Sequence, residues 1–149
     1  MIKEVFQQLW KDKFARISLI VLAVIYAALF FADFIAPYTK DFSDRTMAYV
    51  PPSKIFTIDK DGKLSKPYTY NYVREFDNEN LEIKYTLDRS KKHYIKFFSQ
   101  GQPYKFLGLI PMKRHLFTTD KDGRIFLLGT DINGRDVFSR LLFGGRISM

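Results

Sequence analysis

The stretch that decides the fold is residues 17–32, which read Ile-Ser-Leu-Ile-Val-Leu-Ala-Val-Ile-Tyr-Ala-Ala-Leu-Phe-Phe-Ala and hold no charge. Beyond the single Asp33, apolar residues extend the stretch to Ala36, directly before Pro37. A helix of about 20 residues is about 30 Å long, which matches the hydrocarbon core of a bilayer. The sequence therefore predicts a transmembrane helix over residues 17–36, with Pro37 as its stop and Asp33 at the level of the lipid headgroups.

Two other structures for this run are a buried core helix and a cleaved signal peptide. The segment is apolar on every face, and the chain offers no second apolar layer that would bury it. A signal peptide usually has a shorter apolar region, which ends in a small-x-small cleavage site that this sequence lacks. The run is therefore interpreted as a retained membrane anchor.

The charges around the run indicate which end faces the cytoplasm. Four basic residues precede it, namely Lys3, Lys11, Lys13 and Arg16. The comparable stretch after it has only Lys40 and Arg45, together with two aspartates. This bias places residues 1–16 in the cytoplasm and the bulk of the chain outside. Apolar residues at helical spacing from Ile2 to Phe14 fit a helix on the inner membrane surface, and a plain cytoplasmic overhang fits them equally well.

Composition excludes several classes of protein. The chain has 149 residues, 24 Lys and Arg against 16 Asp and Glu, and no cysteine. A disulfide scaffold, a thiolate metal site and a cysteine nucleophile are therefore excluded. Motifs of hydrolases, zinc proteases and P-loop proteins are absent too, and His93 and His115 are expected to be surface or strand residues. We expect no enzyme activity, no catalytic residue, no metal and no cofactor.

The formal charge of +8 raises the question of a partner. A nucleic-acid-binding protein would carry a basic run or a recognition helix, and neither accompanies the charge here. Anionic lipid headgroups or an acidic face on a protein are the better targets. We therefore expect a lipid bilayer among the partners and no nucleic acid.

Residues 37–128 carry the pattern of a mainly β (α+β) domain. Residues 81–87 alternate apolar and polar side chains, and Tyr68, Tyr70 and Tyr72 alternate in the same way. Shorter candidate strands are residues 94–98 and 124–128, with Gly, Pro, Asn and Asp between the runs. The sequence predicts short strands around a core built mostly from Tyr and Phe.

A weak internal repeat relates residues 55–63 to residues 116–124, each with an Asp-Lys-Asp-Gly run. This run resembles part of an EF-hand calcium loop, but the glutamate that closes such a loop is replaced by Tyr68 and Gly129. A turn in which Gly62 and Gly123 supply a positive φ is the better interpretation.

Residues 129–149 read Gly-Thr-Asp-Ile-Asn-Gly-Arg-Asp-Val-Phe-Ser-Arg-Leu-Leu-Phe-Gly-Gly-Arg-Ile-Ser-Met. The first positions predict a turn with capping groups, and an amphipathic helix is expected over residues 135–143, broken by Gly144 and Gly145. Such a helix can lie at the membrane interface with its apolar face toward lipid, or it can be an ordinary surface helix.

The run G-T-D-x-x-G-R-D-V-x-S-R-L-L-x-G-x-R-I-S, from Gly129 to Ser148, resembles a permease signature. It is similar to the segment before the second membrane helix in the "C-type" inner-membrane permease subunits of the dipeptide/oligopeptide/nickel ABC importers. Gly145 stands where alanine is usual. The signature residues, for which the resemblance implies a structural role, are Gly129, Thr130, Asp131, Gly134, Arg135, Asp136, Ser139, Arg140, Gly144 and Arg146.

The resemblance extends upstream. Pro51-Pro52 after a single membrane helix is similar to the family's N-terminal region, and residues 94–109 resemble members with an enlarged outer domain. The family typically has six membrane helices and a cytoplasmic loop that docks on the ATPase. Only the front part of that plan is expected here, so the chain resembles a fragment that stops before a missing second transmembrane helix.

The resemblance also implies a function and partners. The chain would be part of a permease in the bacterial plasma (inner) membrane that imports peptides or similar solutes, energised by ATP hydrolysis on partner subunits. Those partners would be a second permease subunit, two ATPase subunits and an extracytoplasmic solute-binding protein. The alternative is a self-contained, membrane-anchored extracytoplasmic module with a binding or structural role.

Overall fold

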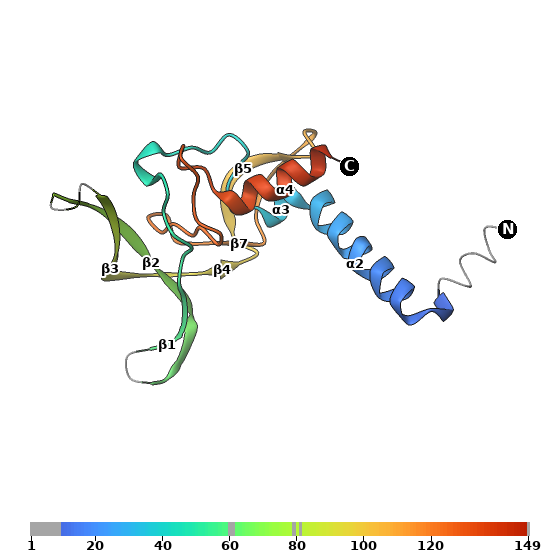
Figure 1. Cartoon of the computed structure of the whole chain (residues 1–149), viewed down its shortest axis with the longest axis horizontal. Coiled ribbons are helices and arrows are strands. Elements are labelled where there is room, and N and C mark those ends of the chain that lie inside the picture. Colours follow the sequence, from blue (N-terminus) through green and yellow to red (C-terminus); the bar gives the residue numbers. More distant parts are fainter. Residues whose placement is uncertain (1–9, 60–61, 79, 81, 149) are drawn as a thin grey trace.

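The computed structural model of the chain describes residues 10–59, 62–78, 80 and 82–148. A long helix, α2 (Lys13–Phe30), extends away from a body built of strands. Its carboxyl end meets this body beside two short helices, α3 (Ala32–Ile35) and α4 (Val137–Ile147) (Figure 1). The inner-surface helix considered from Ile2 onward falls mostly on residues 1–9, outside the described residues.

Helix α2 has the length and composition of a membrane span. It begins at Lys13, four residues before the predicted start, because the Asp12 carboxylate accepts a hydrogen bond of 2.9 Å from the Phe14 N–H and caps the helix. Its mean hydropathy is 2.0 and none of its residues is buried. Within the described part of the chain it is the one helix able to cross a membrane by these criteria.

The predicted helix over residues 17–36 is interrupted near its end. Phe31 has φ −88° and ψ 19°, and a last helical turn, α3, follows it. Ala36 is extended (φ −67°, ψ 127°), as a residue before proline prefers to be, so Pro37 ends the helix as expected.

The region after α3 is mainly β, as predicted. The largest sheet is antiparallel, in the order β1 (Ile55–Ile58), β2 (Leu64–Asp77), β3 (Glu82–Tyr94). Two smaller sheets pair β4 (Lys96–Phe97) with β7 (Phe117–Thr118), and β5 (Gln100–Phe106) with β6 (Ile110–Arg114). A single 3₁₀ turn, η1 (Arg45–Met47), precedes β1.

The three alternating tyrosines lie on the buried side of β2. Tyr68, Tyr70 and Tyr72 are each less than a tenth exposed. Tyr72 packs with Val50 and Phe126 in one apolar cluster, while Tyr68 stacks on Phe56 at 5.7 Å between ring centres. The aromatic alternation therefore identified a real strand face, although aliphatic residues form much of the remaining core.

The strand predicted over residues 124–128 is wrong, and side chains explain why. The amides of residues 124–126 are bonded to side chains from other parts of the chain instead of to a neighbouring strand. The Arg124 N–H donates to Asn71 Oδ1 (2.9 Å), the Ile125 N–H to the Tyr38 hydroxyl (3.0 Å) and the Phe126 N–H to Ser53 Oγ (2.9 Å). Ile125 and Phe126 are buried, so the apolar pattern correctly indicated core residues. It did not indicate a strand, because no backbone hydrogen-bond ladder forms here among the described residues.

The two Asp-Lys-Asp-Gly runs are both turns, although their glycines serve different purposes. The Gly62 N–H donates to the Asp59 carbonyl (2.9 Å), and Gly62 has φ +73°. The Gly123 N–H likewise donates to the Asp120 carbonyl (2.8 Å). The positive φ expected at Gly123 is wrong: a Cβ there would lie 2.8 Å from the His93 Cβ, so close packing is what requires glycine.

The carboxylates of these turns pair with lysines. Asp59 bonds to Lys92 at 2.6 Å, and Asp120 bonds to Lys96 at 2.7 Å. Across the described residues no group of three or more His, Asp or Glu is placed to hold a metal ion. The geometry therefore favours turns over a calcium loop.

Candidate functional site

The signature segment, residues 129–148, begins with a loop that hydrogen-bonds to residues 44–50. Thr130 is buried, its N–H donates to the Val50 carbonyl (3.0 Å), and its Oγ1 accepts the Val50 N–H (2.8 Å). The same hydroxyl donates to the Met47 carbonyl (2.5 Å). One threonine thus satisfies three backbone groups of a segment 80 residues earlier in the chain.

Asp131 organises the turn that follows. Its Oδ1 accepts the N–H groups of Asn133 (2.8 Å) and Arg135 (3.0 Å), and its Oδ2 pairs with Arg135 Nε at 3.0 Å. Burial alone would raise the pKa of this carboxyl, but the backbone N–H groups and the Arg135 guanidinium outweigh it and hold the pKa below its usual range. The carboxylate is thereby kept in the charged form that the turn requires.

Two glycines of the signature are required by both conformation and space. Gly129 has φ +78° and Gly134 has φ +67°, a region that side chains disfavour. A Cβ on Gly129 would lie 2.5 Å from the Val50 carbonyl oxygen, and a Cβ on Gly134 would overlap the carbonyl of Asp44. The signature loop therefore packs directly, backbone against backbone, on the chain that leaves α3.

Asp136 caps helix α4 from a buried position. Its Oδ2 accepts the Ser139 N–H (2.8 Å) and the Ser139 hydroxyl (2.6 Å), and both residues are only 2% exposed. Its Oδ1 is buried without a hydrogen-bond partner in the described part of the chain. Burial raises the pKa of Asp136 above its ordinary value, against the opposing effect of the hydrogen bonds from Ser139.

We expect the titration of Asp136 to affect stability with a defined sign. The folded state binds its proton more tightly than the unfolded state, whose pKa is near 3.8, so the free energy of unfolding should fall as pH rises through the raised pKa. Relative to Asp136→Asn, the wild-type chain should become more stable as pH is lowered from neutrality toward 3.8. Chemical denaturation of both chains across this range measures the effect, and a wild-type chain that gains stability with rising pH relative to the variant would contradict it.

Arg140 and Gly144 are not brought into this arrangement. Both are exposed, none of the described residues pairs with the Arg140 side chain, and a Cβ on Gly144 would meet nothing within 4 Å. The signature residues therefore divide into a group packed against residues 33–50 and a group on the outer face of α4.

Helix α4 corrects two expectations. It runs from Val137 to Ile147 and passes through both glycines that were expected to break it. The reason is packing: Gly145 faces α2, and a Cβ there would lie 2.6 Å from Leu29 Cδ2. Leu142 is buried against Ala32 and Ala36, so this part of the apolar face covers protein and does not face lipid, whereas Leu141 is exposed.

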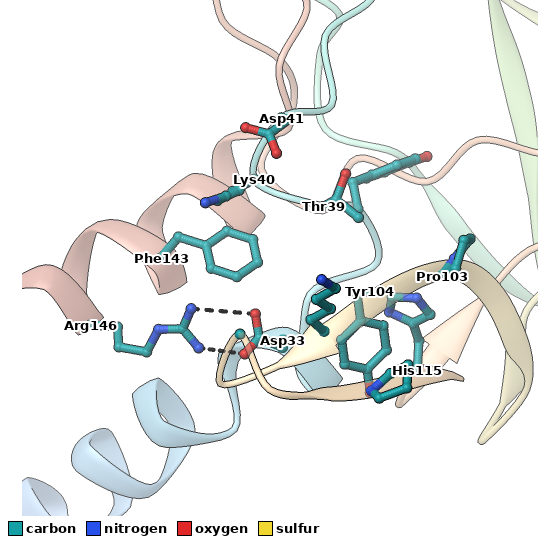
Figure 2. A pocket seen from close by; sticks show the side chains of 13 residues that line it. Asp33, Thr39, Lys40, Asp41, Pro103, Tyr104, His115, Phe143 and Arg146 are labelled. Carbon is teal, nitrogen blue, oxygen red and sulfur yellow. Dashed lines mark hydrogen bonds and ion pairs between the residues drawn. The ribbon is translucent and has the colours of Figure 1, made fainter.

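The most buried charge pair of the site joins α3 to α4. Arg146 donates to both oxygens of Asp33, at 2.5 Å and 3.4 Å, and the Asp33 side chain is only 10% exposed (Figure 2). Asp33 also accepts the Leu107 N–H at 3.0 Å. Sequence reasoning placed Asp33 at the headgroups and missed this pair; the available signal was a lone carboxylate at the end of an apolar run.

A cavity of about 580 Å³ opens beside this pair. Figure 2 shows Lys40, Phe143 and Tyr104 around it, and His115 lies behind Tyr104, with 4.7 Å between the two ring centres. The lining is a mixture of cationic, acidic and aromatic side chains.

Both histidines are buried, and the expectation of a surface or strand position is wrong for His115 alone. His115 is 1% exposed, with Nδ1 2.8 Å from the Ala36 carbonyl oxygen and Nε2 2.8 Å from the Gln102 carbonyl oxygen, so that its ring lies between two backbone carbonyls. His115 follows β6, outside any strand, and it ties the end of α3 to β5. His93 lies in strand β3, as one of the two expected positions, and is 3% exposed.

The apolar helix α2 near the N-terminus agrees with the comparison to known families. Residues 1–52 match the family described as the N-terminal TM domain of oligopeptide transport permease C. The class of protein that these residues resemble is a component of a membrane transport system. More particularly, they are similar to the N-terminal portion of an oligopeptide transport permease C, and the match covers about a third of the chain. No curated protein and no solved structure matches the chain.

Proposed function

We propose that the chain is the front part of a permease subunit in an ATP-driven importer of oligopeptides or similar solutes. In this proposal residues 1–16 lie in the cytoplasm, residues 17–36 cross the plasma membrane, and residues 37–128 lie outside. Residues 129–149 lead the chain toward a second membrane helix. A second permease subunit completes the path, two ATPase subunits supply the energy, and an extracytoplasmic binding protein delivers the solute.

The observation that carries the proposal is the meeting of the signature segment with the residues that match the permease family. The contacts are Thr130 with Val50, Gly134 with Asp44, and Arg146 with Asp33. Two stretches that are far apart in the sequence, and that indicate the same family on separate grounds, therefore form one packed unit. This supports a common permease origin for both ends of the chain.

The mechanism that follows assigns no chemistry to these residues. Polar solutes do not cross hydrocarbon unaided, so a path needs several helices around it. ATP binding and hydrolysis on the partners bias an equilibrium between inward-open and outward-open states, and the permease responds through its differential packing in the two. In this mechanism the chain contributes one membrane helix and an outer region, which positions α4 at the point where the chain turns toward the second membrane helix.

Co-purification with partner subunits tests this function. An affinity-tagged chain, expressed together with the other permease subunit, the ATPases and the binding protein of an oligopeptide importer from the same cells, should retain the permease subunit in mild detergent. A Gly62→Ala variant, altered far from α4, should do the same. Saturable uptake of a labelled oligopeptide by vesicles that contain the 149-residue chain alone would contradict the proposal and favour a self-contained module.

The orientation is tested by cysteine labelling, because the chain has no native cysteine. Ser90 is exposed on β3 and Gln8 precedes the apolar run. In spheroplasts, a membrane-impermeant thiol reagent should label Ser90→Cys and leave Gln8→Cys unlabelled until the membrane is broken, because the excess of basic residues before the run keeps that end inside. Labelling of Gln8→Cys alone would reverse the arrangement.

A further inference from the structure

We propose that an apolar collar around the end of α2 inserts into the outer-leaflet interface of the membrane and binds phospholipid there. The collar consists of Phe98, Leu107, Leu109 and Ile110, from the β4–β5 connection and the tip of the β5–β6 hairpin. The inference rests on the proposed function in one respect, namely that α2 crosses the membrane.

Aromatic and polar contacts fix the collar at the last turn of the apolar helix. The Phe106 ring, next to the hairpin tip, stacks on Phe31 at 6.0 Å and meets Phe30 edge-on at 6.1 Å between centres. The Leu107 N–H donates to Asp33, and the Phe98 ring lies 6.1 Å from Phe34. Figure 1 shows β5 beside α3 and α4, where α2 joins the body. The hairpin is therefore held at the height where a spanning helix would leave the hydrocarbon.

The collar side chains are apolar and open to their surroundings. Leu109 is 81% exposed, Phe98 65%, Ile110 57% and Leu107 42%. Exposed apolar patches of this kind mark interaction surfaces. The surface is continuous, through Phe30 and Phe31, with the wholly unburied apolar side of α2, and the partner that covers a spanning helix is lipid. The occupant that fits the collar is thus the same bilayer.

Charge supports an anionic lipid surface as the partner. Residues 100–114, the whole hairpin, hold Lys105, Lys113 and Arg114 and no acidic side chain. These three exposed cations lie behind the tip, on the strands, so their heads can reach phosphate groups while the tip lies among the upper acyl carbons. Hairpin and helix would then enter the bilayer side by side.

Lipid-borne quenching tests the proposal, because the chain lacks cysteine and accepts single reporters. An environment-sensitive fluorophore is placed at Leu109→Cys, at Val24→Cys in α2, and at Leu64→Cys, a matched leucine on the far hairpin that is 89% exposed. The chain alone is reconstituted in phosphatidylcholine and phosphatidylglycerol vesicles with a nitroxide near the headgroup end of the acyl chain. Unchanged circular dichroism confirms that each variant folds.

The expected result is quenching of the Leu109 reporter about twofold or more above that of the Leu64 reporter, together with a blue shift of its emission. A second measurement adds an aqueous quencher, from which the Val24 reporter should be shielded. If the Val24 reporter is shielded but the lipid nitroxide quenches Leu109 and Leu64 equally and weakly, the collar is overturned while α2 stays in the membrane. Exposure of the Val24 reporter to aqueous quenchers would instead contradict the proposed membrane anchor itself.

Discussion

Replacement of Gly134 by alanine should destabilise the chain more than any other single-methyl addition in the signature. Gly134 has φ +67°, and a Cβ there would overlap the carbonyl oxygen of Asp44, which is backbone and cannot rotate away. The Asp44 N–H also donates to the Gly134 carbonyl at 3.2 Å, so the two loop segments cannot move apart without losing this hydrogen bond. Strain at positive φ and overpacking together should cost about 3 kcal/mol.

Two glycine variants separate the causes of this loss. Gly62 also has a positive φ (+73°), but a Cβ there meets nothing within 4 Å. Gly62→Ala should therefore lower the free energy of unfolding by only about 1 kcal/mol. Gly144→Ala lies in helix α4 with nothing within 4 Å and should be neutral or stabilising by up to about 1 kcal/mol. Thermal unfolding of the four chains in one detergent gives the ranking. If Gly134→Ala melted no earlier than Gly62→Ala, the close approach would not exist in solution.

Removal of either partner of the Asp33–Arg146 pair should produce the second large effect. Asp33 is nearly enclosed, so Arg146→Ala leaves a carboxylate without its cation at a site of low polarity, and Asp33→Ala also removes the acceptor of the Leu107 N–H. Breaking a buried pair typically costs about 3–5 kcal/mol; because the Arg146 side chain is 29% exposed, about 2 kcal/mol is expected here.

A double-mutant cycle measures the pair itself. The double variant Asp33→Ala/Arg146→Ala should be more stable than the sum of the two single losses predicts, because no unpaired charge remains in it. Lys91→Ala removes one partner of an exposed pair, with Asp122, and should leave the melting temperature nearly unchanged. Additive losses at Asp33 and Arg146 would show that the two side chains do not interact.

The features that could be predicted from the sequence are those with a local signal. The apolar run gave α2 because its composition alone identifies it, and the aromatic alternation at Tyr68, Tyr70 and Tyr72 gave β2 because a strand repeats every two residues. The turn with capping groups at residues 130–134 was also predicted, and Asp131 organises it through local bonds to the N–H groups of Asn133 and Arg135. In each case the interacting residues are neighbours in the chain.

The features that could not be predicted depend on partners far away in the chain. Residues 124–126 have strand-like side chains, but the groups that bond their amides come from residues 38, 53 and 71. Gly145 has low helix propensity, yet tertiary packing on Leu29 outweighs about 1 kcal/mol of propensity. The Asp33–Arg146 pair spans 113 positions, and no spacing rule connects such residues.

The same separation has a consequence for how the chain can vary. Residues 33 and 146 touch, so everything between them departs from one point of the molecule and returns to it. Segments whose two ends meet in this way can be lengthened, shortened or exchanged with little effect on the structure that carries them. The region between α3 and α4 thus starts and ends at one place, and its outermost hairpin, β1–β2, can vary in length while the Asp33–Arg146 contact is kept.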